Sequence, residues 1–336
     1  MLKIFLKPIA ISAILFAAVP SMLILSQWPN HPRAAKGEGL NFARLDSPQA
    51  QSAIPPAPPQ DSYTAKDGSK QPLRWFPANA PDAPILILLH GSSWHGLQFE
   101  TLGQKLAQAG IASVAAPDLR GHGFAPKRRG DLDYIGQFDD DIAALIADLK
   151  ARAPGAPILL GGHSSGGGLV VRYAGSGLPQ PDGYVLLAPF LKHNAPTMRP
   201  NAGGWSNVLL RRMIGLSIFN SLGITALNRL TVIEFSVSPQ VADGPLGHTL
   251  TAQYSYRLNT AYAPRSDYTA DIAGLKSPFA LIAGAKDEAF IATEYEPLIS
   301  QYSDQGQYNI VPEIGHLDIV DAEQTSAILT EFLAGF

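Results

Sequence analysis

The chain has 336 residues, and 46% of them are apolar, which is enough for one large domain or two modest ones around a sizeable core. Only 16% are charged and the net charge is −3, which excludes the concentrated basic surface that a nucleic-acid partner needs. The chain has no cysteine, which excludes disulfides, thiolate metal sites and a cysteine nucleophile. The eight histidines show no metal-ligand spacing with carboxylates, so we expect no metal and no cofactor. The composition leaves the oligomeric state open.

The N-terminus begins with Lys3 and Lys7, followed by an uncharged, mostly apolar stretch from Pro8 to Trp28. This layout is typical of a secretory signal or of a single membrane anchor. The stretch is long for a signal-peptide core, just long enough to span, and ends without a convincing cleavage site, which favours the anchor. We therefore expect residues 1–28 to be a signal or membrane anchor. The remainder is then exported, either membrane-anchored or released as a periplasmic or extracellular protein. The alternative is a buried core helix.

A linker is predicted next, because residues 29–60 are rich in Pro, Ala and Gln and cannot build a core. Within it, residues 41–45 can form a first edge strand.

From residue 61 onward, strand patterns alternate with helix patterns. Asp67-Gly68 predicts a hairpin turn between two short strands. Apolar runs predict buried strands, and amphipathic spacing predicts helices between them. The predicted strands are 84–89, 111–116, 157–160, 184–188, 278–283 and 308–311, and the predicted helices are 99–109, 135–149 and 169–174. The alternation predicts an α/β fold with a mostly parallel sheet and helices on both faces, and its active site should lie at the carboxyl ends of the strands.

One Gly-x-Ser-x-Gly pattern, centred on Ser164, lies between a predicted strand and a predicted helix. Gly162 and Gly166 permit the tight, strained turn that lifts a serine hydroxyl clear of the backbone. An ordinary helix N-cap is the alternative reading of this serine. A phosphate-binding loop is disfavoured, because no Lys-Ser/Thr pair follows the glycines.

An acid and a base follow later strands. Asp287 comes after strand 278–283 and His316 after strand 308–311, so the order is nucleophile, acid, base. Glu288 and Asp271 compete for the role of the acid. The alternative for the base is an ordinary loop histidine.

A further loop, His90-Gly91-Ser92, follows strand 84–89, and its glycine lets backbone amides point into the cleft. We expect His90 to stabilise this loop. We expect His163 to be a packing residue beneath the Ser164 turn, and Arg120 and His122 to brace a neighbouring turn. The sequence leaves the role of His95 undecided.

The alternation is interrupted by residues 191–262, which are apolar and carry few charges. An excursion of this length inside an α/β domain is usually a lid or a binding wall, so we predict a cap or lid insertion that roofs an apolar cleft. The alternative is that these residues pack only against one another and the domain.

Seven ordered stretches between residues 63 and 336 carry a resemblance to a known family: DGSKQPLRWFP, ILLHGSS, APDLRGHGFA, LLGGHSSGGGLVVRYA, YVLLAPF, LIAGAKDE and IGHLDIV. The sequence resembles the α/β-hydrolase superfamily, and most closely its monoacylglycerol lipase and lysophospholipase branch. The resemblance implies an α/β-hydrolase core, formed by residues 61–190 and 263–336, with an inserted helical cap. It also implies a Ser164–Asp287–His316 triad and an oxyanion hole made by the backbone amides of Ser92 and Ser165.

These features together predict a serine hydrolase that cleaves carboxylic esters through an acyl-enzyme on Ser164. Lipid-like esters, either lysophospholipids or monoacylglycerols, are the favoured substrates, since the apolar insertion and the membrane segment both suit them. The same triad also serves amidases, aminopeptidases and thioesterases, and residue types do not separate these activities. The alternative of another class is a non-catalytic envelope scaffold that has kept the fold.

Overall fold

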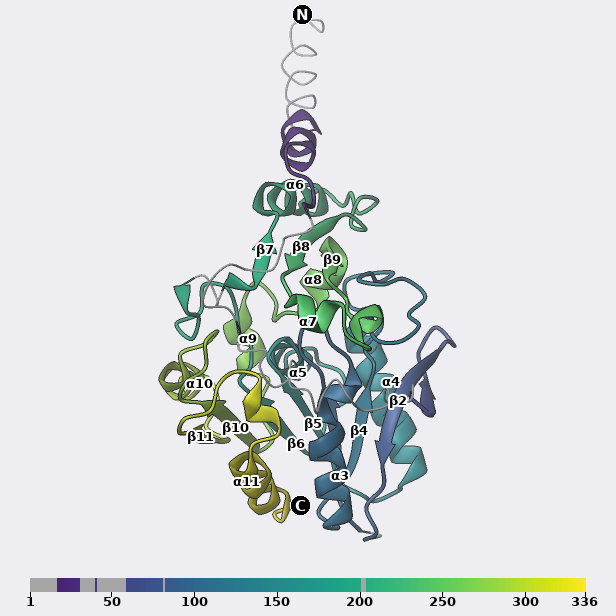
Figure 1. Ribbon diagram of the computed structural model, residues 1–336, viewed down its shortest axis with the longest axis vertical. Coiled ribbons are helices and arrows are strands. Elements are labelled where there is room, and N and C mark those ends of the chain that lie inside the picture. Colours follow the sequence, from purple (N-terminus) through teal and green to yellow (C-terminus); the bar gives the residue numbers. More distant parts are fainter. Residues whose placement is uncertain (1–16, 31–39, 41–58, 81, 201–203) are drawn as a thin grey trace, which may run out of the picture.

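The computed structural model describes residues 17–30, 40, 59–80, 82–200 and 204–336, in which a layered α/β core lies beneath a smaller cap (Figure 1). The core sheet has the strand order β1-β2-β4-β3-β5-β6-β10-β11. The first two neighbour pairs are antiparallel and the rest are parallel, and the predicted hairpin turn at Asp67-Gly68 joins β1 to β2. The strands are β1 (Asp61–Thr64), β2 (Lys70–Phe76), β3 (Ile85–Leu89), β4 (Ser113–Pro117), β5 (Ile158–His163), β6 (Gly183–Leu187), β10 (Phe279–Gly284) and β11 (Gly306–Val311).

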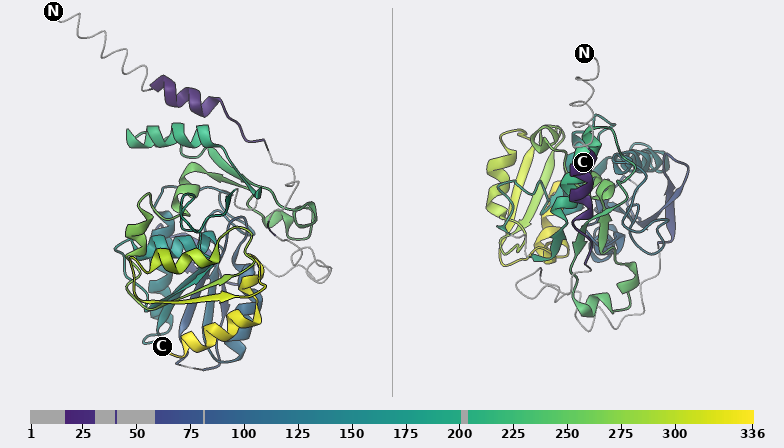
Figure 2. Two further views of the ribbon diagram at one scale, coloured as in Figure 1. Left: turned by 90° about the vertical axis from the view of Figure 1, so that its left-hand side faces the viewer. Right: turned by 90° about the horizontal axis from the view of Figure 1, so that it is seen from above.

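Helices cover both faces of this sheet. On one face α3 packs against α11, and on the other α5 packs against α4 and α9 (Figures 1 and 2). The strands β3, β5, β6 and β10 are therefore buried along their whole length, which explains why they are continuous apolar runs in the sequence. The helical elements of the core are η1 (Gly96–Phe99), α3 (Glu100–Gln108), α4 (Gln137–Arg152), α5 (Ser165–Ala174), α9 (Tyr268–Ile272), η4 (Ala292–Glu294), α10 (Tyr295–Ile299), η5 (Asp318–Val320) and α11 (Glu323–Leu333). The predicted α/β-hydrolase fold, with its mostly parallel sheet, is confirmed.

The cap lies between β6 and β10 in the chain and contains more than helices. It has helices α6 (Leu210–Ser221), α7 (Pro239–Ala242), η3 (Gly247–Thr249) and α8 (Tyr256–Ala261). It also has an antiparallel sheet, β7-β8-β9, formed by Ser206–Val208, Thr231–Phe235 and Gln253–Ser255. The sequence predicts a helical cap and does not predict this sheet, because strands of three to five residues are too short to show a clear alternating pattern.

A short N-terminal helix, residues 17–25, lies alongside α6 at the outer end of the cap (Figure 2). Its Ile24 is buried in a small apolar cluster with Leu216 and Phe219 of α6. Within the described part of the chain, no helix has the length and apolar character needed to cross a membrane. Most of the predicted signal or anchor, the expected strand at 41–45 and most of the linker at 29–60 lie outside the described residues.

The topology places the candidate side chains together. The loops that follow β3, β5, β10 and β11 all leave the carboxyl edge of parallel strands, on the side of the sheet that the cap covers (Figure 1).

Candidate active site

The turn at Ser164 is strained in the way the sequence predicts. Ser164 lies between the end of β5 and the start of α5, with φ 53° and ψ −118°. Residues other than glycine rarely adopt a positive φ, so this backbone conformation persists only where the surrounding structure enforces it. A Cβ on Gly162 would lie 2.4 Å from the backbone carbon of Gly166, and a Cβ on Gly166 would lie 2.1 Å from the Leu89 carbonyl oxygen. Positions 162 and 166, two residues before and two residues after the serine, must therefore be glycine for the strand, turn and helix to fit together.

A hydrogen-bonded chain joins the three candidate catalytic side chains, all of which are buried. His316 Nε2 lies 3.0 Å from Ser164 Oγ, and His316 Nδ1 lies 2.8 Å from Asp287 Oδ2. Because a carboxylate can only accept, Nδ1 carries the proton and Nε2 is free to accept from the serine hydroxyl. Asp287 Oδ1 accepts from the backbone amides of Ala289 and Phe290 at 2.8 and 2.7 Å.

The Asp287 carboxyl is held in its charged form despite its burial. Burial alone would raise its pKa, but the adjacent His316 and the hydrogen bonds from the ring and from the two backbone amides lower the pKa below its usual value. The carboxylate therefore stays negative, orients the imidazole and can stabilise its positive form.

The two competing acids have other partners. Glu288 Oε2 accepts from the backbone amide of His316 at 2.8 Å, so it holds the loop and not the ring. Asp271 belongs to α9 and is paired with Arg265. The structure therefore brings only Asp287 of these three acids to the imidazole.

The two serines predicted to supply oxyanion-hole amides lie side by side. The hydroxyls of Ser92 and Ser165 are 2.7 Å apart, and both residues line the same cavity as Ser164. Among the described residues, no acceptor is found for the backbone N–H of either serine. Ser165 is also the first residue of α5, where the helix dipole favours negative charge. Two backbone amides without an acceptor among the described residues, one from the loop after β3 and one from the start of α5, therefore belong to residues that line the cavity with Ser164.

Gln98 and His163 connect the loop His90-Gly91-Ser92, which we call the oxyanion loop, to His316, the candidate base. The sequence did not reveal this link. Gln98 Oε1 accepts from the Gly91 amide at 2.8 Å, and its Nε2 lies 2.8 Å from His163 Nδ1. His163 Nε2 lies 2.9 Å from the His316 carbonyl oxygen, which can only accept, so Nε2 donates there and Nδ1 accepts from Gln98. His163 thus lies beneath the turn, as predicted, but it also ties the backbone of the base to the oxyanion loop.

Two tyrosines from the cap, also missed, hold the oxyanion loop from above. The Tyr254 hydroxyl accepts from the Ser93 amide at 2.6 Å, and the Tyr262 hydroxyl donates to the His90 carbonyl. His90 itself bonds within the loop, with Nδ1 2.8 Å from the Gly91 carbonyl, and its Nε2 accepts from Leu119 N at 3.1 Å. The predicted stabilising role of His90 fits these contacts. The cap is therefore bonded directly to the loop that carries one oxyanion donor.

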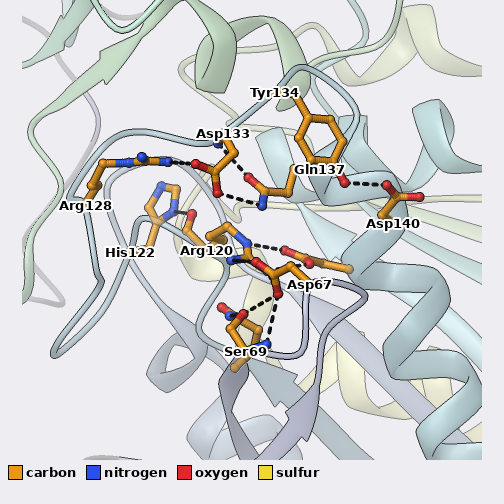
Figure 3. Close-up of polar contacts among 11 residues, drawn as sticks. Asp67, Ser69, Arg120, His122, Arg128, Asp133, Tyr134, Gln137 and Asp140 are labelled. Atoms are coloured by element: carbon orange, nitrogen blue, oxygen red, sulfur yellow. Dashed lines mark hydrogen bonds and ion pairs between the residues drawn. The ribbon is translucent and has the colours of Figure 1, made fainter.

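The turn after β4 is braced by a network of charged side chains (Figure 3). Arg120 bridges Asp67 of the β1–β2 hairpin and Asp141 of α4, with distances of 3.0 and 2.8 Å. His122 Nδ1 lies 3.1 Å from the Arg120 carbonyl oxygen, and its Nε2 lies 2.9 Å from the Tyr254 hydroxyl. Arg120 and His122 thus hold the turn after β4, as expected from the sequence. The contact between His122 and Tyr254 also connects this turn to the cap.

The structure also gives His95 a partner. Its Nε2 lies 2.9 Å from the hydroxyl of Thr249 in the cap, while its Nδ1 stays 3.9 Å from Asp118. The ring is fully buried, so it has no path to a substrate. Searching the described residues for three or more ligating side chains around one point finds no candidate metal site.

A cavity of about 620 Å³ opens above Ser164 between the core and the cap. Its wall is mostly apolar, and the cap contributes Trp205, Val208, Ile233 and Phe235. The polar residues at its base are Ser92, Ser164, Ser165 and His316. The site therefore combines a serine hydrogen-bonded to a histidine, two backbone amides without an acceptor among the described residues, and an apolar cavity.

Buried neutral histidines make the fold sensitive to acid. Burial lowers the pKa of His163 to about 3 and that of His90 to about 4, and it lowers the pKa values of His95 and His122 well below their usual value. Each of these groups binds a proton near pH 6.5 only when the chain is unfolded. Burial raises the pKa of Asp118 to about 6 and also raises the pKa values of Asp139 and Asp141, so these three carboxyls act in the opposite direction, because the folded state holds their protons to higher pH.

We predict that the free energy of unfolding falls as the pH is lowered from 6.5 to 4.5, since the four histidines outnumber the three carboxyls. Replacing His163 with Gln removes one of the four, so the slope should become shallower by about 1.4 kcal/mol per pH unit. Denaturant unfolding at several pH values measures both slopes. An identical slope in the wild type and the His163→Gln variant would show that this histidine is not held neutral.

The chain is similar to known hydrolases over most of its length. The family model described as Hydrolase_4, serine aminopeptidase S33, matches residues 80–323. A monoacylglycerol lipase of Mycolicibacterium smegmatis is 25% identical over 254 residues, which cover 74% of this chain and 86% of that protein.

Solved structures share the fold. A soluble variant of monoglyceride lipase from Saccharomyces cerevisiae superposes with a TM-score of 0.65 at 17% identity, covering 84% of this chain and 96% of that one. A bacterial membrane phospholipase A superposes with a TM-score of 0.55 at 17% identity, covering 100% of this chain and 99% of that one. The family match extends from the strand before the oxyanion loop to beyond the candidate base, so the chain belongs to the Hydrolase_4 (serine aminopeptidase S33) family of α/β-hydrolases.

Proposed function

We propose that this ester hydrolase acts on lipid-like carboxylic esters through an acyl-enzyme on Ser164. The observation that carries the proposal is the Ser164–His316–Asp287 hydrogen-bonded chain at the base of an apolar cavity of about 620 Å³.

The acylation step follows from the hydrogen bonds. Ser164 Oγ attacks the ester carbonyl carbon while its proton passes to His316 Nε2, 3.0 Å away. The imidazolium that forms is stabilised by Asp287, which keeps its negative charge. His316 then gives the proton to the leaving alcohol oxygen as the C–O bond breaks, and the acyl group remains on Ser164.

The negative charge on the tetrahedral intermediate meets donors that are already in place. The amides of Ser92 and Ser165 are the candidates, and one such donor typically lowers the barrier by about 3 kcal/mol. In the second half of the reaction, water replaces the alcohol, His316 takes its proton, and the fatty acid leaves as the Ser164 hydroxyl is restored.

The cavity supports a lipid-like substrate over a small polar one. Its wall is formed largely by apolar side chains of the cap, which suit an acyl chain more than a charged or sugar-like group. The relatives named as monoacylglycerol lipase and monoglyceride lipase point in the same direction.

Between the two favoured lipid classes, one charged side chain supports the lysophospholipid. Among the described residues that line the cavity, Arg199 carries the only permanent charge and none is a carboxylate. Its Nε donates to the carbonyl oxygens of Asp287 and Phe290 at 2.8 and 3.1 Å, which holds the guanidinium on the loop of the acid. Within the described structure, Nη1 and Nη2 have no hydrogen-bond partner. A guanidinium with free donors is suited to a phosphate group.

The same charge argument disfavours the aminopeptidase and amidase alternative that the family description raises. An aminopeptidase must hold the ammonium group of its substrate, which a carboxylate would do best, and the described lining has Arg199 instead. A thioesterase remains the second candidate, because an acyl thioester also fits an apolar cavity. A non-catalytic scaffold, the alternative of another class, would need neither a serine hydrogen-bonded to His316 nor two amides without an acceptor beside it.

We further propose that the protein is exported and held at a membrane by its N-terminal segment. The uncharged stretch from Pro8 to Trp28 behind two lysines supports this location.

Replacing Asp287 with Asn should lower kcat for a p-nitrophenyl ester by about 10⁴-fold, because the imidazole would lose its tautomer and its counter-charge. The matched control is Glu288→Gln, which removes the neighbouring charge but keeps an acceptor for the His316 amide, so we expect a loss below about tenfold. Steady-state kinetics on both variants decides the assignment. Equal losses, or a larger loss for Glu288→Gln, would contradict the role of Asp287.

Replacing Arg199 with Met should change the substrate preference. We expect kcat/KM for a lysophospholipid to fall about tenfold or more relative to kcat/KM for the monoacylglycerol with the same acyl chain, because a phosphate loses a charged partner and a glycerol hydroxyl does not. The ratio of the two constants corrects for any disturbance of the acid loop. A ratio equal to that of the wild type would contradict the assignment of Arg199 to the head group.

A further inference from the structure

The exposed apolar side chains of the described residues are concentrated at the outer end of the cap. Nine of the twelve large ones lie there, and the other three, Tyr134, Tyr302 and Ile310, are elsewhere. We call these nine residues the outer face; they are Val19, Met22, Leu25, Trp28, Val208, Leu210, Ile214, Leu222 and Ile224. Met22 and Leu25 are 70% and 62% exposed. A monomeric soluble protein rarely exposes so much apolar surface in one place unless it binds something there.

The two helices that carry most of this face are packed tightly against each other (Figure 2). A Cβ added to Gly215 of α6 would lie 2.6 Å from the carbonyl oxygen of Pro20 and 2.8 Å from Cγ1 of Ile24. Pro20 and Ile24 are one helical turn apart on the buried side, while Val19, Met22 and Leu25 point away from α6 to solvent. The glycine therefore lets the N-terminal helix approach α6 at close range.

Two consecutive arginines fix the end of the N-terminal helix. The backbone amide of Arg211 donates to Gln27 Oε1 at 2.9 Å, and its Nη2 donates to the Ser26 carbonyl oxygen at 2.9 Å. Arg212 is buried, lies 5.0 Å from the Trp28 ring and donates to the Thr231 carbonyl of β8 at 3.2 Å. Residues 20–28 are thus bonded into the cap, and their removal would expose an apolar groove along α6.

Residues 191–230 contain five basic residues and no Asp or Glu, although the whole chain has a net charge of −3. Two of the five, Lys192 and Arg199, lie toward the core and the cavity, and the others belong to α6 and the turn that follows it. Arg211 and Arg229 are exposed. Apolar side chains flanked by arginines, with no acid among them, are typical of a surface that lies on anionic lipid.

The alternative occupants fit this surface less well. A second copy of this chain would bring the same arginines against one another without a carboxylate to pair them. In the sequence, the residues of the N-terminal helix belong to the uncharged, mostly apolar stretch from Pro8 to Trp28, a composition that favours lipid over water.

We propose that residues 17–28 are retained as a permanent part of the cap, and that the outer face binds an anionic lipid bilayer. Val208 is 40% exposed and also lines the cavity above Ser164, so the outer face reaches the rim of the cavity. An acyl chain can therefore pass from the bilayer into the cavity without crossing a polar surface. This last step rests on the proposed lipid ester hydrolysis, whereas the docking of the outer face does not.

The absence of native cysteines makes a direct test of docking possible. Ile214→Cys on α6 and Ile310→Cys on β11 form a matched pair, with native exposures of 43% and 45%. Each full-length variant is labelled with an environment-sensitive fluorophore and reconstituted into phosphatidylglycerol–phosphatidylcholine vesicles containing a nitroxide lipid. We expect blue-shifted emission and quenching of about twofold or more at position 214 and neither at position 310. Equal signals from the two positions would overturn docking by this face.

A second measurement tests retention. The intact mass of the protein purified from its native membranes should include residues 17–28, and a mature N-terminus beyond residue 28 would overturn the retention.

A third measurement separates docking from catalysis. Ile214→Glu should lower hydrolysis of a long-chain lysophospholipid in anionic vesicles about tenfold and leave a soluble short-chain ester unaffected, while Ile310→Glu changes neither. If Ile214→Glu hydrolyses the vesicle substrate as fast as the wild type, the link between the outer face and the cavity is wrong. If the wild type cleaves no ester at all, the proposed function fails, and the fluorescence result still decides the docking.

Discussion

The strained backbone at Ser164 is the constraint on which the rest of the site depends. A positive φ at a serine costs conformational free energy. The conformation is retained here because β5, α5 and the loop after β3 pack closely around the turn. Those contacts leave no room for a side chain at Gly162 or Gly166. The hydroxyls of Ser92 and Ser165 lie 2.7 Å apart beside this turn, so the packing that fixes the proposed nucleophile also brings together the two residues proposed to stabilise the developing charge.

The site is held together by hydrogen bonds between loops that are far apart in the sequence. Gln98 and His163 tie the oxyanion loop to the backbone of His316, and Tyr254 of the cap ties the same loop to His122. A buried donor or acceptor without its partner is expensive, so each link fixes the next. The cap is consequently bonded to the candidate active site as well as being the roof of the cavity, and a cap that rests on a bilayer would set the orientation of the whole site.

Much of this architecture could be predicted from the sequence, because buried parallel strands are continuous apolar runs and each candidate side chain follows one of them. Ser164, Asp287 and His316 could be placed in order for that reason. The choice of Asp287 over Glu288 needed the structure, since adjacent loop residues face different partners: one contacts the imidazole and the other a backbone amide. Gln98, Tyr254 and Tyr262 left no local signal, because their partners lie far away in the chain. The cap sheet was missed because its strands are too short for a periodic pattern.

The central claim is that Ser164 is the attacking nucleophile. Treating the folded, full-length protein with a fluorophosphonate, digesting it and mapping the adduct by mass spectrometry tests this claim directly. If Ser164 is the nucleophile, the wild type yields one phosphonylated peptide, modified at Ser164, and the Ser164→Ala variant yields no adduct. A folded protein that stays unmodified, or an adduct on another residue in both proteins, would contradict it.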